Sequence, residues 1–281
     1  IPNGKQGSAS NGDAVVVEIT DRDIQSSFRS GYIVKVLGDC NPSTLALEHA
    51  ICKFDIPIEW PENVVEQARG ISESLTRKDI EARHDLRTIS FVTIDGSDAK
   101  DFDDAVHVKK TPKGFVIHVA IADVSHYVQR FSPIDDEAFS RSTSVYFSNR
   151  VIPMLPERLS NGICSLKPNE DRLALVCKIF VKEDGVVSRS TFFEAVIRSK
   201  ARLTYEEVNS YFCERTDVQS PSDTGILENL QTLYCLYKEL DNAKHERGAL
   251  DIDLSAQRLL YNDRNQLCGI EETERLASHR A

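Results

Sequence analysis

The chain has 281 residues, a length that suits one large domain or two of ordinary size. Hydrophobic residues make up 41% of it, enough for a core, but no apolar run approaches the ~20 residues that a membrane-spanning helix needs. The net charge of −10 argues mildly against nucleic acid as a partner, although a nuclease that holds metal ions also accumulates acidic residues.

The seven cysteines are scattered, and none forms a C-x-x-C pair. Zinc and thioredoxin-type sites therefore lack support, and the pattern is typical of a reduced, intracellular protein. No basic-then-apolar signal segment opens the chain. Because its first residue is Ile1 rather than methionine, we expect a fragment of a longer protein.

The first part of the chain predicts a small antiparallel sheet. Residues 1–12 are rich in Gly, Ser and Asn, which is typical of a loop. The runs AVVVEIT (14–20) and GYIVKVLG (31–38) combine alternation with β-branched residues and predict two strands. Pro61 is well placed in the first turn of a helix, so residues 61–85 are expected to form a helical connector between two units.

The second unit is predicted to combine several strands with one long helix. Alternation and apolar runs predict strands at residues 88–95, 104–110, 114–124, 173–181 and 190–199. The second and third of these form a hairpin, and Asp184-Gly185 forms the turn between the last two. Apolar residues at helical spacing from Ile226 to Leu240 predict a helix that Gly248 ends.

An acidic cluster follows the first of these strands. Five aspartates lie within ten residues, and four of them interest us most: Asp95, Asp101, Asp103 and Asp104. A carboxylate at a strand end stands over the sheet, and the following loop can fold the later ones back towards it. Neighbouring residues in extended backbone point to opposite faces. One of Asp103 and Asp104 could therefore bind a metal ion while the other orients a water molecule or a second ion. Mg²⁺ prefers such oxygen ligands and would assist phosphodiester hydrolysis.

Other interpretations of the cluster remain open on these residues alone. The EF-hand pattern of a calcium loop fails, because Ser97 and Ala99 stand third and fifth from Asp95. A solvated acidic loop is the commoner explanation of such runs, although solvated runs rarely lie between two core strands. Turn formation by aspartate accounts for Asp98.

An ordered series of motifs runs along the chain: TIDGSDAKDFDDA, HVAIADVSHYV, STSVYF, IPMLPERLSNGICSL and ARLTYEEV. Together they resemble the ribonuclease II/ribonuclease R (RNB) family, and the acidic loop is closer to its ribonuclease R form. GDAVVVEIT and GYIVKVLGD similarly resemble the second cold-shock domain, an OB-fold, that precedes the catalytic domain in this family.

The resemblance implies a mixed α/β (α+β) fold, with an OB-fold-like β-barrel segment followed by a truncated ribonuclease II-type (RNB) catalytic domain. We expect a cold-shock domain at residues 1–60, the connector at 61–85 and the catalytic domain at 86–281. Family members continue beyond this point into a long helix with two glutamates. We therefore expect an exposed apolar face on the sheet and weak or no activity of the chain alone.

The resemblance also implies a function. Family members are 3′→5′ exoribonucleases that hydrolyse single-stranded RNA processively to nucleoside 5′-monophosphates in RNA turnover. By residue match, Asp95, Asp104 and Asp101 would hold Mg²⁺, or Mn²⁺ in its place. Asp103 and Asp101, with Tyr205, would serve catalysis. The expected partner is the 3′ end of single-stranded RNA, with no membrane and no nucleotide cofactor, in a bacterial cytoplasm.

Two tyrosines match aromatic residues that contact RNA in the family, Tyr146 in STSVYF and Tyr205 in ARLTYEEV. Stacking on an aromatic ring ignores base identity, which suits an enzyme that accepts every nucleotide. Between Val145 and Phe147, however, Tyr146 is by sequence alone better interpreted as a core residue. Only the resemblance favours RNA binding there.

Other polar residues near the cluster have simpler interpretations. His107, His118 and His126 alternate in a way that predicts strand positions, and Mg²⁺ prefers oxygen ligands. Asp123 ends a strand and is expected to support the site. Arg198, Lys200 and Arg202 precede Tyr205 and would either contact phosphates or lie at a solvated strand end.

Two rival functions remain open. One is an RNA-binding scaffold that has lost catalytic activity. The presence of all four acidic residues argues against it. The other is a metal-binding module without a nucleic acid partner, which would bind Mg²⁺ or Ca²⁺ and show no affinity for RNA at low salt.

Overall fold

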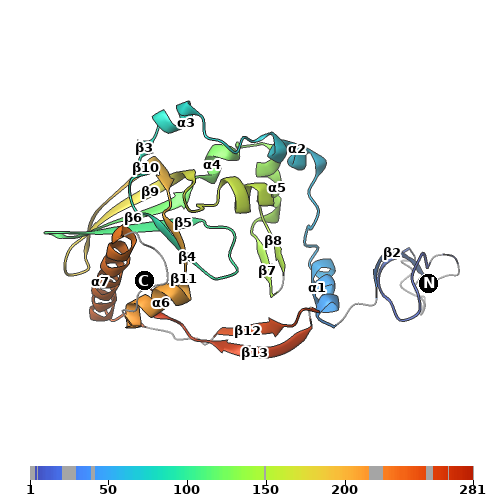
Figure 1. Ribbon diagram of the computed structural model, residues 1–281. Coiled ribbons are helices and arrows are strands. Elements are labelled where there is room, and N and C mark those ends of the chain that lie inside the picture. Colours follow the sequence, from blue (N-terminus) through green and yellow to red (C-terminus); the bar gives the residue numbers. More distant parts are fainter. Residues whose placement is uncertain are drawn as a thin grey trace. The chain divides into compact units, whose positions relative to one another are not determined.

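The structure is a computed structural model that describes residues 4, 6–20, 30–38, 42–148, 150–214, 224–250, 256–264 and 266–280. The chain forms two compact units (Figure 1). Unit 1 comprises Ile1–Trp60, Ser144–Ile152 and Gln257–Thr273, and unit 2 comprises Pro61–Thr143, Pro153–Ala256 and Glu274–Ala281. The two later segments of unit 1 belong to the part of the sequence that resembles the RNB domain.

Unit 1 contains short sheets and one helix. Its elements are β1 (Ala14–Ile19), β2 (Gly31–Gly38), α1 (Pro42–Lys53), β7 (Val145–Phe147), β8 (Arg150–Ile152), β12 (Ala256–Tyr261) and β13 (Leu267–Thr273). The predicted antiparallel pairing of β1 with β2 is confirmed, with Ala14 opposite Gly38 and Ile19 opposite Gly31. The sequence analysis missed α1 and the pairs β7–β8 and β12–β13.

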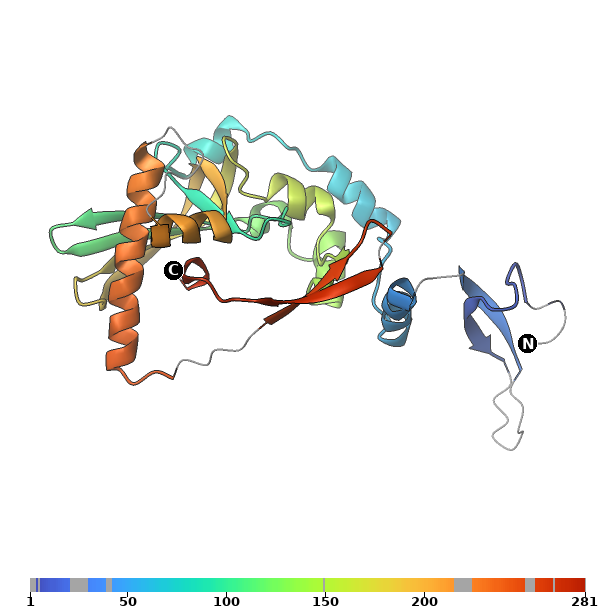
Figure 2. The same cartoon turned by 60° about the horizontal axis from the view of Figure 1, so that its bottom comes forward.

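Unit 2 is built on a seven-stranded sheet in the order β11-β4-β5-β6-β9-β10-β3 (Figures 1 and 2). Its strands are β3 (His84–Asp85), β4 (Val92–Asp95), β5 (Asp104–Thr111), β6 (Gly114–Ala122), β9 (Asp171–Val181), β10 (Val187–Arg198) and β11 (Ala201–Thr204). The pairs β4–β11 and β3–β10 are parallel, and the other pairs are antiparallel. All five predicted strands of this unit are confirmed, although β4 begins only at Val92.

The helices of unit 2 are α2 (Glu62–Gly70), α3 (Arg77–Glu81), α4 (Val124–Tyr127), α5 (Pro133–Arg141), α6 (Tyr205–Glu214) and α7 (Thr224–Glu246), with a π-helical turn at Arg158–Ile163 and a 3₁₀ turn at Ala277–His279. The predicted helix after Pro61 is confirmed as α2, and Thr76 starts a second helix, α3, with a capping box that includes Asp79. Both helices belong to unit 2, so a separate connector at residues 61–85 stays a prediction. Gly248 follows α7 with a φ of 73°, the left-handed conformation that ends helices. The sequence analysis missed α5 and α6.

Helices α6 and α7 pack on the sheet of unit 2 (Figure 2). One apolar cluster contains Val92, Leu203, Val208, Phe212, Ile226 and Leu230. A second cluster contains Val108, Phe115, Val181, Leu233 and Leu236. Because α7 contributes residues to both clusters, the apolar side of this amphipathic helix packs against the sheet along its length.

A buried asparagine joins α7 to the edge of β5. Strands β4 and β5 are paired only at Val92 and Val106, so β5 has further backbone groups without a strand partner. The Asn229 side chain accepts a hydrogen bond from the Val108 N–H (2.7 Å) and donates to the carbonyls of Ser90 (3.0 Å) and Val106 (3.3 Å). The side chain thereby replaces missing ladder hydrogen bonds.

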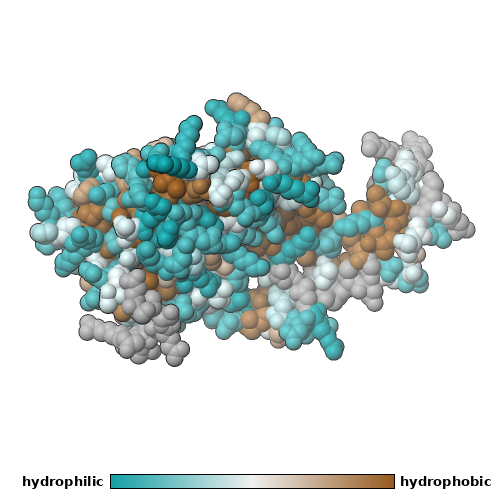
Figure 3. All heavy atoms as spheres, turned by 45° about the horizontal axis from the view of Figure 1, so that its top comes forward, coloured by the Kyte–Doolittle hydropathy of each residue, from teal (hydrophilic) through white to brown (hydrophobic). Residues whose placement is uncertain are grey.

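Some apolar side chains of the sheet are exposed. Ile121 on β6 and Leu175 on β9 stand opposite each other, and each is 46% exposed. Phe192 on β10 is 69% exposed. Figure 3 shows a largely hydrophilic face on which apolar residues gather in separate patches. No helix within the described part of the chain is long and apolar enough to cross a membrane.

Candidate active site

The acidic residues lie where the neighbouring strands β4 and β5 of unit 2 end and begin. Asp95 is the last residue of β4, and Asp104 is the first residue of the antiparallel strand β5. The loop between them carries Asp101 and Asp103. Parallel strand β11 ends beside them, with Thr204 opposite Asp95, so the next residue of the chain enters α6 at the same edge. Strand pairing therefore brings the predicted acids together.

The four carboxylates repel one another. Burial, followed by the charge of Asp104, raises the pKa of Asp95 to about 6, although Arg202 opposes this shift and Asp101 and Asp103 add to it. Burial and the charges of Asp101 and Asp104 raise the pKa of Asp103. Burial alone raises the pKa of Asp104. The raised pKa values mean that the site destabilises the negative charge of these carboxylates, and a cation bound among them would offset this destabilisation.

The acidic loop is held in place by an arginine from β11. The Arg202 guanidinium donates hydrogen bonds from Nη2 to the carbonyls of Gly96 (2.7 Å) and Ser97 (2.9 Å), and lies 5.7 Å from the centre of the Phe102 ring. Phe102 is buried, and its N–H donates to the Ser165 hydroxyl at 3.0 Å. Since Phe102 lies between Asp101 and Asp103, its burial fixes the backbone from which both carboxylates project.

One carboxylate oxygen in the site lacks a partner. Oδ2 of Asp95 is buried and accepts no hydrogen bond. A buried acceptor in this state is costly unless a bound group satisfies it, so the side chain fits a metal ligand. In the part of the chain that the structure describes, no three His, Cys, Asp or Glu side chains converge into a complete cation site. Mg²⁺ fits such a partial set, since it takes one or two carboxylates and completes its shell with water and phosphate.

Tyr205 lies beside the acids, as the first residue of α6. Burial raises its pKa, and the negative charges of Asp95 and Asp104 raise it further. Its ring stacks on the imidazole of His279, with the ring centres 4.3 Å apart and the planes at 23°. The tyrosine is therefore within electrostatic range of the predicted metal ligands.

Tyr146 belongs to β7 in unit 1 and is 67% exposed. The interpretation of this residue as part of the core is therefore wrong. Alternation along the short strand turns its ring outward, whereas the neighbouring Val145 and Phe147 are half-buried. An exposed aromatic ring is what stacking on a base requires.

Asp123 is buried and forms an ion pair with Arg83, whose Nη2 donates to its Oδ2 at 2.6 Å. The Ser125 hydroxyl donates to Oδ1 at 2.7 Å. Burial would raise the pKa of this carboxyl, but these two hydrogen bonds lower it below its usual value. Asp123 thus joins the end of β6 to the segment before β3, a structural role.

Two of the three histidines lie where the alternation predicts. His107 and His118 face each other across β5 and β6, close to Phe91. Burial lowers the pKa of His118 to about 4. The prediction is wrong for His126, which lies in helix α4 with its Nε2 3.7 Å from a carboxylate oxygen of Asp79. The strand ends at Ala122, where the backbone turns into the helix.

A groove of about 840 Å³ adjoins the acidic loop. Its lining includes the cationic side chains of Lys100, Lys167 and Arg202, as well as Phe102. The lining also includes the carboxylates of Asp98 and Glu170, so three positive and two negative side chains line this groove.

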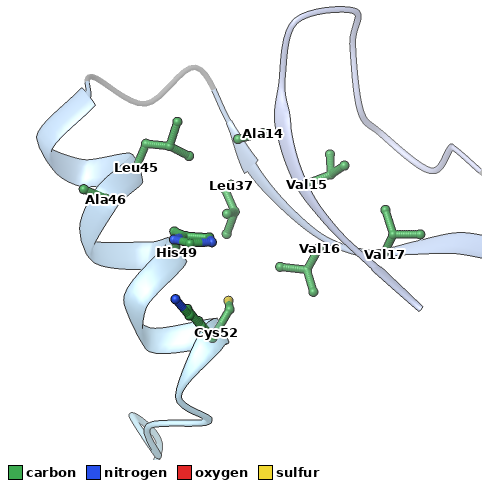
Figure 4. A pocket seen from close by; sticks show the side chains of 10 residues that line it. Ala14, Val15, Val16, Val17, Leu37, Leu45, Ala46, His49 and Cys52 are labelled. Atoms are coloured by element: carbon green, nitrogen blue, oxygen red, sulfur yellow. The ribbon is translucent and has the colours of Figure 1, made fainter. Parts of the chain in front are cut away.

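A second groove, of about 850 Å³, lies within unit 1 between the β1–β2 sheet and α1. Figure 4 shows Val16 and Leu37 pointing towards the helix, which carries Leu45 and His49. Most of the lining is apolar, and none of the described residues that line it carries a carboxylate.

The sequence analysis missed two side chains that shape the site, the hydroxyl of Ser165 and the ring of His279 that stacks on Tyr205. It named Arg202 only as a phosphate contact or a solvated strand end, whereas the guanidinium binds the carbonyls of the acidic loop. The partners lie far apart in sequence, and no local pattern marks them.

Comparison with known protein families agrees with the motifs. Residues 83–281 match the RNB domain model, and residues 1–61 match a cold shock domain model. Ribonuclease R of Escherichia coli (strain K12) is 42% identical over 281 residues, which are 100% of this chain and 34% of that protein. Ribonuclease R of Thermotoga maritima is 42% identical over 251 residues, or 86% of this chain and 34% of that protein. The chain thus spans about a third of the length of these relatives.

Solved structures show the same fold. The structure of Mycoplasma genitalium RNase R with ribose methylated single-stranded RNA superposes with a TM-score of 0.91 at 28% identity, covering 100% of this chain and 43% of that one. Its complex with double-stranded RNA gives a TM-score of 0.89 at 29% identity, covering 98% and 48%. Yeast Ssd1, a pseudonuclease, shares the fold at a TM-score of 0.61 and 18% identity, covering 84% and 28%. The mixed α/β fold and the resemblance to the ribonuclease II/ribonuclease R family are confirmed, and the chain belongs to the RNB family, with a cold shock domain before its RNB domain.

Proposed function

We propose that this chain forms part of an exoribonuclease that hydrolyses single-stranded RNA from the 3′ end with the help of Mg²⁺. The observation that carries the proposal is the buried, partnerless oxygen of Asp95 among four mutually repelling carboxylates, with Tyr205 beside them. The ribonuclease R relatives support the reaction class, and two of the similar structures contain RNA.

Each acid has a role in this proposal. Asp95 and Asp104, together with Asp101, hold Mg²⁺, for which Mn²⁺ substitutes. The bound ion supplies activation of water and neutralises charge on the phosphate. Asp103, whose pKa is raised, orients the attacking water and accepts its proton. Arg202 keeps the loop in place throughout.

RNA is bound by stacking and by positive charge. Tyr205 stacks near the 3′ end, and the exposed ring of Tyr146 stacks on another base. The cationic groove beside the acidic loop attracts the backbone phosphates. The products are nucleoside 5′-monophosphates released processively, in the cytoplasm. Residues 1–60 serve as the cold-shock domain, 61–85 as the connector and 86–281 as RNB domain.

The test uses a 5′-labelled, single-stranded RNA incubated with the chain in Mg²⁺ and in EDTA, with products resolved on a gel. We expect a descending ladder that requires Mg²⁺ and disappears with Asp103→Asn, while RNA binding persists. Asp98→Asn, in an exposed residue of the same loop, is the matched control and should leave the ladder unchanged.

The other outcomes separate the rival functions. RNA binding without any Mg²⁺-dependent product would identify this chain as an RNA-binding scaffold. Metal binding without RNA affinity at low salt would identify a metal-binding module, and would refute the proposal.

A further inference from the structure

The residues that follow β13 pack on the start of α6. The buried Ser278 donates a hydrogen bond from its hydroxyl to the carbonyl of Tyr205 at 2.7 Å. The N–H of Ala277 donates to the side-chain oxygen of Asn209, one turn further along the helix, at 3.1 Å. The backbone of Tyr205 is therefore attached to a segment more than seventy residues away in sequence.

The same segment places an imidazole against the Tyr205 ring. The ring centres of His279 and Tyr205 are 4.3 Å apart, with an interplanar angle of 23°, which is a stacked arrangement. The His279 ring is held by its own turn, because Nδ1 accepts a hydrogen bond from the Leu276 N–H at 3.1 Å. Since an acceptor nitrogen carries no proton, the stacked imidazole has its proton on Nε2.

This arrangement decides how Tyr205 meets a ligand. His279 covers one face of the phenol ring, so a nucleobase has only the opposite face on which to stack. Fixing the ring before RNA arrives reduces the conformational entropy that binding would otherwise cost.

We propose that His279 is a positioning residue, whose imidazole holds the Tyr205 ring so that the terminal base of an RNA stacks on its free face. The inference rests on the proposed function for its substrate, a 3′-terminal nucleotide. It assigns to the segment at Glu274–Arg280 a part in substrate recognition that the motifs do not indicate.

The experiment is a double-mutant cycle on RNA binding. Dissociation constants of a 5′-labelled single-stranded RNA are measured in EDTA for the unmodified chain, His279→Ala, Tyr205→Ala and the double variant. We expect His279→Ala to weaken binding about three- to tenfold, the range that aromatic pairs contribute. In the Tyr205→Ala background the same change should cost nothing further, because the two residues act as one unit.

Three controls separate positioning from a structural role. His279→Phe restores a stacking ring and should recover binding, whereas His279→Leu fills the space and should not. An RNA whose 3′-terminal nucleotide is abasic should bind the unmodified chain and His279→Ala equally. His245→Ala, in an exposed histidine at the end of α7, is the matched control and should bind normally.

The outcomes separate the two proposals. Absence of RNA binding by the unmodified chain overturns the proposed function and this inference with it. If His279→Ala leaves RNA binding unchanged, this inference alone is overturned. The same holds if the variant weakens the binding of abasic and unmodified RNA equally. Tighter binding by His279→Ala would also overturn it, because His279 would then occupy the place that the base takes.

Discussion

Replacing Asp95 with asparagine should stabilise the metal-free chain. The folded state holds this carboxyl at a pKa of about 6 instead of 3.8, so it binds more protons than the unfolded state between these values. The free energy of unfolding therefore falls as the pH rises from about 4 to about 6, and remains low above that range. Asp95→Asn removes the charge and with it this loss.

The magnitude follows from the shift. A pKa difference of about two units corresponds to about 3 kcal/mol. Because the side chain is only half-buried, screening by solvent reduces the destabilisation to about 1–2 kcal/mol. In a domain of this size the midpoint of thermal unfolding should rise by about 2–8 °C.

The assay is thermal unfolding in EDTA at pH 8 and at pH 4, repeated at pH 8 with Mg²⁺. The advantage of Asp95→Asn should be present at pH 8 and absent at pH 4. Mg²⁺ should stabilise the unmodified chain and have little effect on the variant, since a ligand that binds only the folded state raises its stability. Asp98→Asn, in the same loop, serves as the control. A variant that is less stable than the unmodified chain at pH 8, or that Mg²⁺ stabilises equally, would refute the electrostatic reasoning.

Three further changes test other parts of the structure. Asn229→Leu should lower the free energy of unfolding by about 2–4 kcal/mol, because a buried N–H of β5 loses its acceptor; denaturant unfolding measures this, with the exposed Asn242→Leu as control. Arg83→Met should cost about 3–5 kcal/mol by leaving Asp123 as an unpaired buried charge, and adding Asp123→Leu should recover most of the loss. Tyr146→Ala should weaken RNA binding roughly fivefold to a hundredfold, as a titration with labelled RNA would show.

Each of these predictions has an outcome that contradicts it. Unchanged stability with Asn229→Leu would mean that water or a shifted backbone satisfies the edge of β5. A double variant at Arg83 and Asp123 no more stable than Arg83→Met alone would show that the cost is lost packing rather than an unpaired charge. Equal RNA binding by Tyr146→Ala would remove this residue from the RNA-binding surface.

The sequence predicted the elements whose signal is local. Alternating apolar residues marked β5, β6, β9 and β10, because successive side chains of a strand point to opposite faces. Helical spacing from Ile226 and the glycine after it marked α7 and its end. The acids were found in the same way, since they follow one strand and precede the next. Helices α5 and α6 were missed because their apolar stripes are short and interrupted by polar residues.

Tertiary structure alone decided which partner each polar group finds. Arg202 reaches the carbonyls after Asp95 only because β11 pairs in parallel with β4. His279 meets Tyr205 only because the chain returns to α6 after β13. Hydrophobic periodicity is set by neighbours along the chain, so it can be read from the sequence. A hydrogen bond or a ring stack between distant residues depends on how their segments pack in three dimensions. The local sequence pattern does not contain that information.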